Sequence, residues 1–125
     1  MIIVGDIGNT EIKICLVNSK NKIVKRVNLN TKKINYSTFK KAISILDIKD
    51  KSIKRCLICS VVPKSYNKIK FFFNRLYKIK CYELKKLELN KLIKIKVNYK
   101  QIGSDRLANA ISVINNKDNF IILDF

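Results

Sequence analysis

The chain of 125 residues contains no histidine and no tryptophan, and only three glycines and one proline. Without histidine, the sequence has no Ser-His-Asp or Cys-His nucleophile pair, no His-ligated metal site and no imidazole general base. Acid–base or metal chemistry must therefore come from the nine acidic residues, the lysines or the four cysteines. Carboxylates prefer hard cations such as Mg²⁺.

Long apolar runs are also missing. No segment approaches the roughly 18 apolar residues that a membrane span requires, and residues 1–6 lack the features of a secretory signal. Cys56 and Cys59 lie in one apolar run that is typical of a buried strand, where residues three apart point to opposite faces. Thiols on opposite faces are poorly placed to share a zinc ion or to form a disulfide. We therefore interpret these two, with Cys15 and Cys81, as free thiols and expect a cytoplasmic protein.

The charge balance is strongly basic, with 27 Lys plus Arg against 9 Asp plus Glu and a formal net charge of +18. Such a balance suggests a nucleic-acid partner, and a basic nucleic-acid-binding module stays an alternative function. The basic residues are spread along the chain, and segments such as Ile12-Lys13-Ile14 alternate apolar with basic residues. This pattern favours solvated faces of half-buried strands, enriched in lysine by an A/T-rich codon bias.

Hydrophobic periodicity predicts an α/β fold. Strands are expected over 1–7, 11–18, 22–29, 55–62, 79–83 and 120–125, with the first strand central because it is apolar on both faces. An apolar stripe from Phe39 to Leu46 predicts a helix with Ser37 or Thr38 as its N-cap. Further helices are expected over 64–77, opened by Pro63, and over 104–116, while residues 84–100 are assigned only as partly extended.

The three glycines fall in two short segments, 5–10 and 102–106. In a chain this poor in glycine, they indicate positions that need a positive φ or a close approach, with ordinary turns as the alternative. Asp6 ends the first apolar strand and is expected to be buried without a basic neighbour. A Mg²⁺ ion carrying a nucleotide phosphate would relieve the cost of that charge. The backbone N–H groups of Gly8, Asn9 and Thr10, with the Thr10 hydroxyl, could then hold phosphate oxygens.

The second segment places Asp105 and Arg106 in the first turn of a predicted helix. The positive end of the helix dipole keeps Asp105 ionised, so that it could accept a proton from a substrate hydroxyl. Arg106 is suited to a substrate carboxylate. The alternative is that Asp105 is only a favourable residue for capping a helix.

Three motifs in this order resemble type III pantothenate kinases: residues 6–10 (DIGNT), 60–63 (SVVP) and 102–110 (IGSDRLANA). The resemblance implies a ribonuclease-H-like half of the two-domain acetate-and-sugar-kinase/actin-like (ASKHA) fold. It also implies ATP-dependent phosphorylation of pantothenate to 4′-phosphopantothenate, the first step of coenzyme A biosynthesis. The implied enzyme is a cytoplasmic homodimer that uses ATP, Mg²⁺ and a monovalent cation, K⁺ or NH₄⁺.

The resemblance also implies roles for residues on the nucleotide side of the site. Asp6 would organise Mg²⁺ through the phosphates, and Gly8, Asn9 and Thr10 would bind the nucleotide phosphates. Asp124 would match the aspartate associated with the monovalent cation.

On the acceptor side, the resemblance implies that Asp105 is the general base. Together with Gly103, Ser104 and Arg106, it would also bind pantothenate. A low-pKa aspartate can serve here because phosphoryl transfer depends mainly on positioning and charge neutralisation.

The chain departs from the family pattern in two places. Tyr99 stands where the family usually has a proline, and Lys96 stands near the place of a pocket tyrosine. The glycine-threonine phosphate motif expected after Asp124 is missing, because the sequence ends at Phe125. We therefore expect residues 1–119 to form the first domain and 120–125 to be the first strand of a second, truncated one. The alternative is a non-catalytic remnant, or half of a split kinase that pairs with a complementing C-terminal half.

Overall fold

The computed structural model describes residues 1–48, 53–115 and 118–123. Its strands are β1 (Ile2–Ile7), β2 (Glu11–Val17), β3 (Ile23–Asn30), β4 (Arg55–Ser60) and β5 (Lys80–Glu83). Its α-helices are α1 (Tyr36–Ile45), α2 (Pro63–Tyr77) and α3 (Ser104–Ser112), and two short 3₁₀ turns are η1 (Leu84–Lys86) and η2 (Leu89–Lys91). The predicted α/β class is confirmed.

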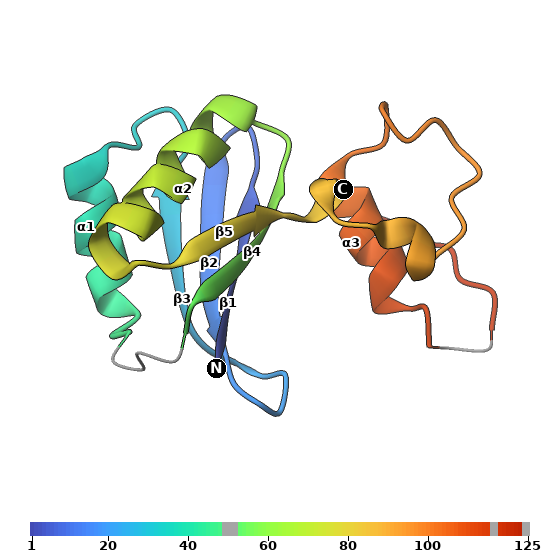
Figure 1. Ribbon diagram of the computed structural model, residues 1–125, viewed down its shortest axis with the longest axis horizontal. Coiled ribbons are helices and arrows are strands. Elements are labelled where there is room, and N and C mark those ends of the chain that lie inside the picture. The colour runs from blue at the N-terminus through green and yellow to red at the C-terminus, as the bar shows by residue number, and fades with distance from the viewer. Residues whose placement is uncertain (49–52, 116–117, 124–125) are drawn as a thin grey trace.

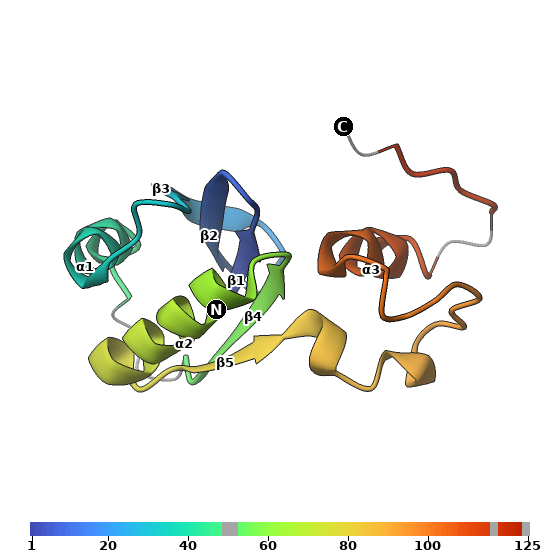
Figure 2. The same ribbon diagram turned by 90° about the horizontal axis from the view of Figure 1, so that it is seen from above.

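The five strands form one mixed sheet in the order β3-β2-β1-β4-β5. β1, β2 and β3 make an antiparallel meander, whereas β1, β4 and β5 run parallel to one another. β1 is central, as its two apolar faces predicted. This order, with α1 and α2 together on one face of the sheet (Figures 1 and 2), agrees with the ribonuclease-H-like half that the resemblance implied.

The main core lies between the sheet and these two helices. Alternate residues of the strands point into it, so that Ile3 and Ile7 of β1 are buried while Asp6 between them is not. From the helices, Phe39 and Phe73 meet edge to face with their ring centroids 5.0 Å apart. The period-two and helical patterns of the sequence therefore decide which side chains form this core.

The start of α1 corrects one prediction. Its N-cap is Asn35, not Ser37 or Thr38. Asn35 Oδ1 accepts a hydrogen bond from the Thr38 N–H at 3.0 Å, and Thr38 Oγ1 accepts one from the Asn35 N–H at 3.0 Å. Thr38 thus takes part in the cap from the third helical position, as in a capping box. The prediction for α2 is confirmed, with Pro63 at its first position.

Residues 84–115 lie beyond the carboxyl ends of β4 and β5 (Figure 1). They form a second, smaller hydrophobic cluster around Leu84, Leu89 and Leu107, which also includes Cys59 of β4. Two short 3₁₀ turns and loops replace the partly extended chain expected over 84–100. α3 ends at Ser112 and is therefore shorter than the helix predicted over 104–116.

The strand predicted over 120–125 does not appear in residues 120–123. The side chains of Phe120, Ile121, Ile122 and Leu123 are exposed. A strand needs a neighbour for its backbone hydrogen bonds, and residues 120–123 are not paired with the sheet. Residues 124 and 125, with the predicted cation ligand Asp124, lie outside the described residues.

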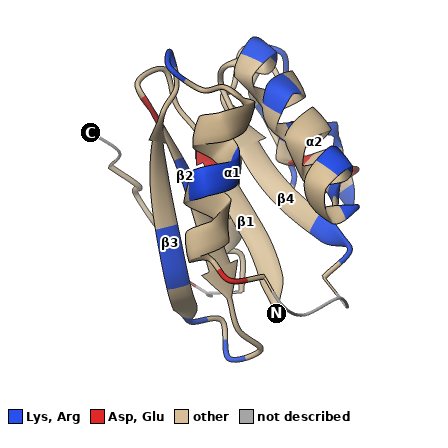
Figure 3. Ribbon diagram, turned by 90° about the vertical axis from the view of Figure 1, so that its left-hand side faces the viewer, with Lys and Arg blue, Asp and Glu red and all other residues tan. Residues whose placement is uncertain are grey.

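Basic residues are distributed over several elements. Figure 3 shows Lys and Arg on α1, α2 and β3. In β2, Lys13 is exposed between the buried Ile12 and Ile14, as the alternating pattern predicted. This distribution agrees with the interpretation of the lysines as solvated side chains.

Candidate functional site

The first glycine segment forms the turn between β1 and β2. The Gly8 N–H donates to the Glu11 carbonyl oxygen at 2.9 Å, and Thr31 Oγ1 donates to the Gly8 carbonyl oxygen at 2.8 Å. A Cβ atom at Gly8 would lie 3.3 Å from the Glu11 carbonyl oxygen, which is a close approach. Asn9 and Thr10 are exposed at the tip of the turn, so their side chains are available to a ligand.

Asp6 differs from its prediction. It is exposed rather than buried, and Lys13 of β2 lies directly opposite it in the antiparallel register. The reason is the strand alternation, which gives the core face of β1 to Ile3 and Ile7. The expectation of a buried carboxylate without a basic neighbour is therefore wrong, and Asp6 is instead accessible at the end of a central strand.

The SVVP motif lies beside this turn. The Val61 N–H donates to the Ile7 carbonyl oxygen at 3.1 Å, so the end of β4 is attached to the end of β1. Ser60 Oγ accepts from the Val62 N–H at 3.1 Å, which shapes the turn into α2. The first two motifs therefore meet where the parallel strands β1 and β4 end.

The second glycine segment leads into α3. Gly103 is the N-cap with a φ of −69°, and Asp105 is in the first turn, where its Oδ1 accepts from the Arg106 N–H at 2.9 Å. A Cβ atom at Gly103 would collide with Asp105 Oδ1. None of the described glycines has a positive φ. Glycine is therefore needed at position 103 because the Asp105 side chain approaches the backbone closely, and not because of a left-handed conformation.

Cys59 of β4 connects the two loops electrostatically. Burial raises the pKa of its thiol, and the negative charges of Asp6, Glu83 and Asp105 raise that pKa further, to about 11. In the parallel register Cys59 lies opposite Asp6. The charges of the two predicted aspartates therefore both influence the Cys59 thiol, although Asp6 lies near the end of β1 and Asp105 lies in the first turn of α3.

Sequence reasoning missed Glu83, the third carboxylate in this group. It is the last residue of β5 and is buried. Ser104 Oγ donates a hydrogen bond to Glu83 Oε1, and the Lys85 N–H donates to the same oxygen at 3.2 Å. Ser104 was predicted to bind substrate, but its hydroxyl is turned toward β5. The available signal was an acidic residue at the end of a short strand.

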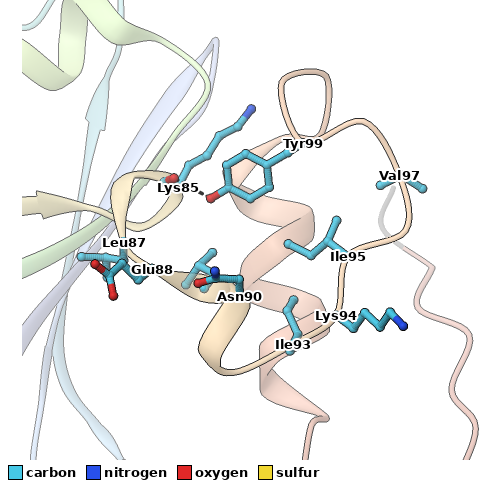
Figure 4. A pocket seen from close by; sticks show the side chains of 10 residues that line it. Lys85, Leu87, Glu88, Asn90, Ile93, Lys94, Ile95, Val97 and Tyr99 are labelled. Atoms are coloured by element: carbon cyan, nitrogen blue, oxygen red, sulfur yellow. Dashed lines mark hydrogen bonds between the residues drawn. The ribbon is translucent and has the colours of Figure 1, made fainter.

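Two hollows are lined by residues of the α3 side of the molecule, and one of them includes the second glycine segment. One of about 400 Å³ lies between the end of β4, the first turn of α2 and Gly103. The other, of about 690 Å³, is lined mainly by apolar side chains of residues 87–99 (Figure 4). At its edge the Tyr99 hydroxyl donates to the Lys85 carbonyl oxygen at 2.5 Å, so this departure from the family pattern attaches the loop to η1. Lys96, the other departure, is exposed.

Within residues 1–48, 53–115 and 118–123, no three His, Cys, Asp or Glu side chains are grouped so that they could hold a metal ion. Among the same residues, no helix is both long and apolar enough to cross a membrane.

Comparisons with known proteins agree with the motifs. A family model described as type III pantothenate kinase matches residues 2–125. A type III pantothenate kinase of Pelagibacter ubique (strain HTCC1062) is 76% identical over 125 residues, which are all of this chain and 50% of the relative. The chain thus spans about half the length of this curated relative. Among solved structures, the Lmo2764 protein from Listeria monocytogenes aligns with a TM-score of 0.42 and 10% identity, over 66% of this chain and 34% of that one.

Proposed function

The chain belongs to the type III pantothenate kinase family, and from this premise we propose that it contributes to transfer of the γ-phosphoryl group of ATP to the 4′-hydroxyl of pantothenate. This reaction would make it a phosphotransferase at the entry to coenzyme A biosynthesis. The observation that carries the proposal is the position of Cys59, which lies opposite Asp6 in the sheet and packs in the same hydrophobic cluster as Leu107 of the helix that carries Asp105. It supports one site that is built from both glycine segments.

On the nucleotide side, the exposed turn between β1 and β2 would receive the phosphates of ATP. The side chains of Asn9 and Thr10 are exposed there, and Gly8 keeps the backbone free of a Cβ atom. Mg²⁺ fits this arrangement because a single exposed carboxylate, Asp6, is enough for an ion whose remaining ligands are phosphate oxygens and water. When bound, Mg²⁺ would neutralise charge on the transferred phosphoryl group.

On the acceptor side, Asp105 would accept the proton of the pantothenate 4′-hydroxyl as that oxygen attacks phosphorus. The exposed Arg106 would hold the pantothenate carboxylate. Gly103 gives the Asp105 carboxylate room next to the backbone, and the hollow of about 400 Å³ beside Gly103 and Ser104 gives room for the acceptor. Ser104 would contribute through its backbone, because its hydroxyl is bonded to Glu83.

The partners and the setting of the reaction are part of the same proposal. The chain would act as a homodimer or with a complementing C-terminal half, and a monovalent cation, K⁺ or NH₄⁺, would bind near Asp124. A cytoplasmic location is supported by the four cysteines, which are free thiols in the structure.

Pantothenate-dependent ADP release tests the proposal. The purified chain would be assayed alone and mixed with the second half of the Pelagibacter relative, with ATP and Mg²⁺. We expect Asp105→Asn to lower kcat by about 100-fold or more, because the general base is lost. Asp47→Asn is the matched control, since Asp47 is exposed and pairs with Lys25 at 3.8 Å, away from the site.

Full activity of Asp105→Asn would contradict the assignment of the base. If the wild-type chain releases no ADP in either mixture, the proposed function of this chain is wrong.

A further inference from the structure

A buried hydrogen bond joins β5 to the start of α3. Ser104 Oγ donates to Glu83 Oε1, and the two residues are only 1% and 9% exposed. Glu83 is the last residue of β5 and Ser104 is the first residue of α3. Such a bond to a carboxylate is stronger than one between neutral groups, and it is protected here from competition by water.

A second set of bonds holds the segment that leads to α3. Lys85 Nζ donates to the Ile102 carbonyl oxygen at 2.6 Å and to the Lys100 carbonyl oxygen at 3.0 Å. In return, the Lys85 carbonyl oxygen accepts from the Tyr99 hydroxyl at 2.5 Å. The residues directly after β5 therefore hold the loop over 99–102, while Glu83 holds the helix itself.

The geometry of α3 connects this anchor to Asp105. Ser104 and Leu107 are three residues apart, so they share one face of the helix, and both are buried. Asp105 and Arg106 occupy the adjacent, more exposed positions. The N-cap, Gly103, supplies no side-chain hydrogen bond, whereas the Ser104 hydroxyl bonds this first turn to β5 and the buried Leu107 packs the same face of the helix.

We propose that Glu83 and Ser104 are a pair of positioning residues that hold the first turn of α3, and with it the Asp105 carboxylate, against the end of β5. Neither is a catalytic residue, because their polar groups are bonded to each other. The anchoring stands on the hydrogen bonds and burial alone, whereas its consequence for phosphoryl transfer rests on the proposed function.

The Cys59 thiol provides a readout that does not depend on activity. Its alkylation by iodoacetamide at pH 8.5 follows the thiolate fraction, and fragment-ion mass spectrometry distinguishes Cys59 from Cys56. In the wild-type chain, Asp105→Asn removes one of the negative charges that disfavour the thiolate, so we expect alkylation to become about threefold faster. In a Ser104→Ala background, where Asp105 is no longer held, we expect Asp105→Asn to have no further effect.

The conservative variant and a matched control complete the design. Ser104→Thr keeps the hydroxyl, so Asp105→Asn should again accelerate alkylation about threefold. Ser112→Ala lies on the same helix and removes an exposed hydroxyl that donates to the Asn109 carbonyl oxygen at 2.7 Å, and it should leave the effect unchanged. Glu83→Met removes the acceptor of the hydrogen bond instead of the donor. If circular dichroism shows that the Ser104→Ala chain is unfolded, Glu83→Met is used in its place.

An equal acceleration by Asp105→Asn in the wild-type chain and in the folded Ser104→Ala or Glu83→Met chain would overturn the proposal. In a preparation that turns over, Ser104→Ala should lower kcat about tenfold with the KM for ATP unchanged, and Ser104→Thr should restore it. A wild-type chain without activity that still shows the expected alkylation pattern would contradict the proposed function but not the anchoring.

Discussion

The sheet body (residues 1–83) and the α3 region (residues 84–115) are held together in different ways. In the sheet body, two helices cover one face of five strands, and large side chains such as Phe39, Phe73 and Ile3 are completely buried. In the α3 region, the buried apolar residues are Leu84, Leu89 and Leu107. Hydrogen bonds from Ser104, Lys85 and Tyr99 supplement this small cluster.

The difference matters because the two candidate aspartates belong to different regions. Asp6 lies within the central strand of the sheet body, whereas Asp105 depends on the packing of a nine-residue helix. Short helices are marginal without tertiary contacts. We therefore expect the α3 region to open at a lower free energy than the sheet body, so that the position of Asp105 is lost before that of Asp6.

The largest effect is expected in the sheet body. Phe73→Ala removes a fully buried ring that packs against Phe39, and it should lower the free energy of unfolding by about 3–5 kcal/mol. Urea unfolding followed by circular dichroism measures this loss. Phe71→Ala, in the same helix but 53% exposed, is the control and should cost less than about 1 kcal/mol.

A smaller and local effect is expected in the α3 region. Leu107→Ala removes the central side chain of its cluster, at a cost of about 2–3 kcal/mol to the packing of α3. Hydrogen exchange should show α3 amides exchanging about 30-fold or more faster, while β1 amides keep their protection. Leu92 is exposed, so the control Leu92→Ala should leave the exchange of both the α3 and the β1 amides unchanged. Equal loss of protection in β1 would mean that the two regions unfold as one unit.

The smallest effect concerns Cys59, at the boundary between the regions. Burial and the three carboxylates raise its pKa to about 11, so the folded protein keeps the proton that the unfolded chain releases near its ordinary value. The contribution of this thiol to stability is therefore fully present below about pH 8.5. The free energy of unfolding then falls as the pH rises toward about 11.

Cys59→Ala should make this decline smaller. The total fall in the free energy of unfolding should shrink by less than about 1 kcal/mol, because the thiol is partly exposed. The two chains differ only at position 59, so the difference between the two denaturation series isolates the thiol. Parallel curves between about pH 9 and about pH 11 would show that burial and the carboxylates together do not raise the pKa of Cys59.

Most of the sheet body could be predicted from the sequence because period-two and helical patterns report directly on burial. The strands and α2 follow these patterns closely, and the apolar character of residues 1–7 predicted their central place. The N-cap of α1 could not be read in the same way, because Asn35, Ser37 and Thr38 are all capping residue types. Which of the three becomes the N-cap depends on the residue at which the backbone turns into the helix.

The α3 region was less predictable for a physical reason. Residues 84–100 are positioned by side-chain bonds to backbone groups, such as those of Lys85 and Tyr99, which leave no periodic signal. The motifs found Asp6, Asp105 and Arg106, but not Glu83, because its role depends on a partner 21 residues away. The apolar run over 120–123 resembles a strand in composition, but composition alone does not supply the neighbour that a strand requires.

The mixed sheet also determines the order in which the site can form. The meander joins residues close in the chain, such as Ile7 with Ile12, whereas β1 must wait for β4 to bring Cys56 beside Ile3. Contacts between distant residues form slowly, and during synthesis the N-terminal segment is available first. The nascent chain therefore exposes the turn between β1 and β2 before the ribosome has made the helix that carries Asp105, and the candidate site is completed by a late step of folding.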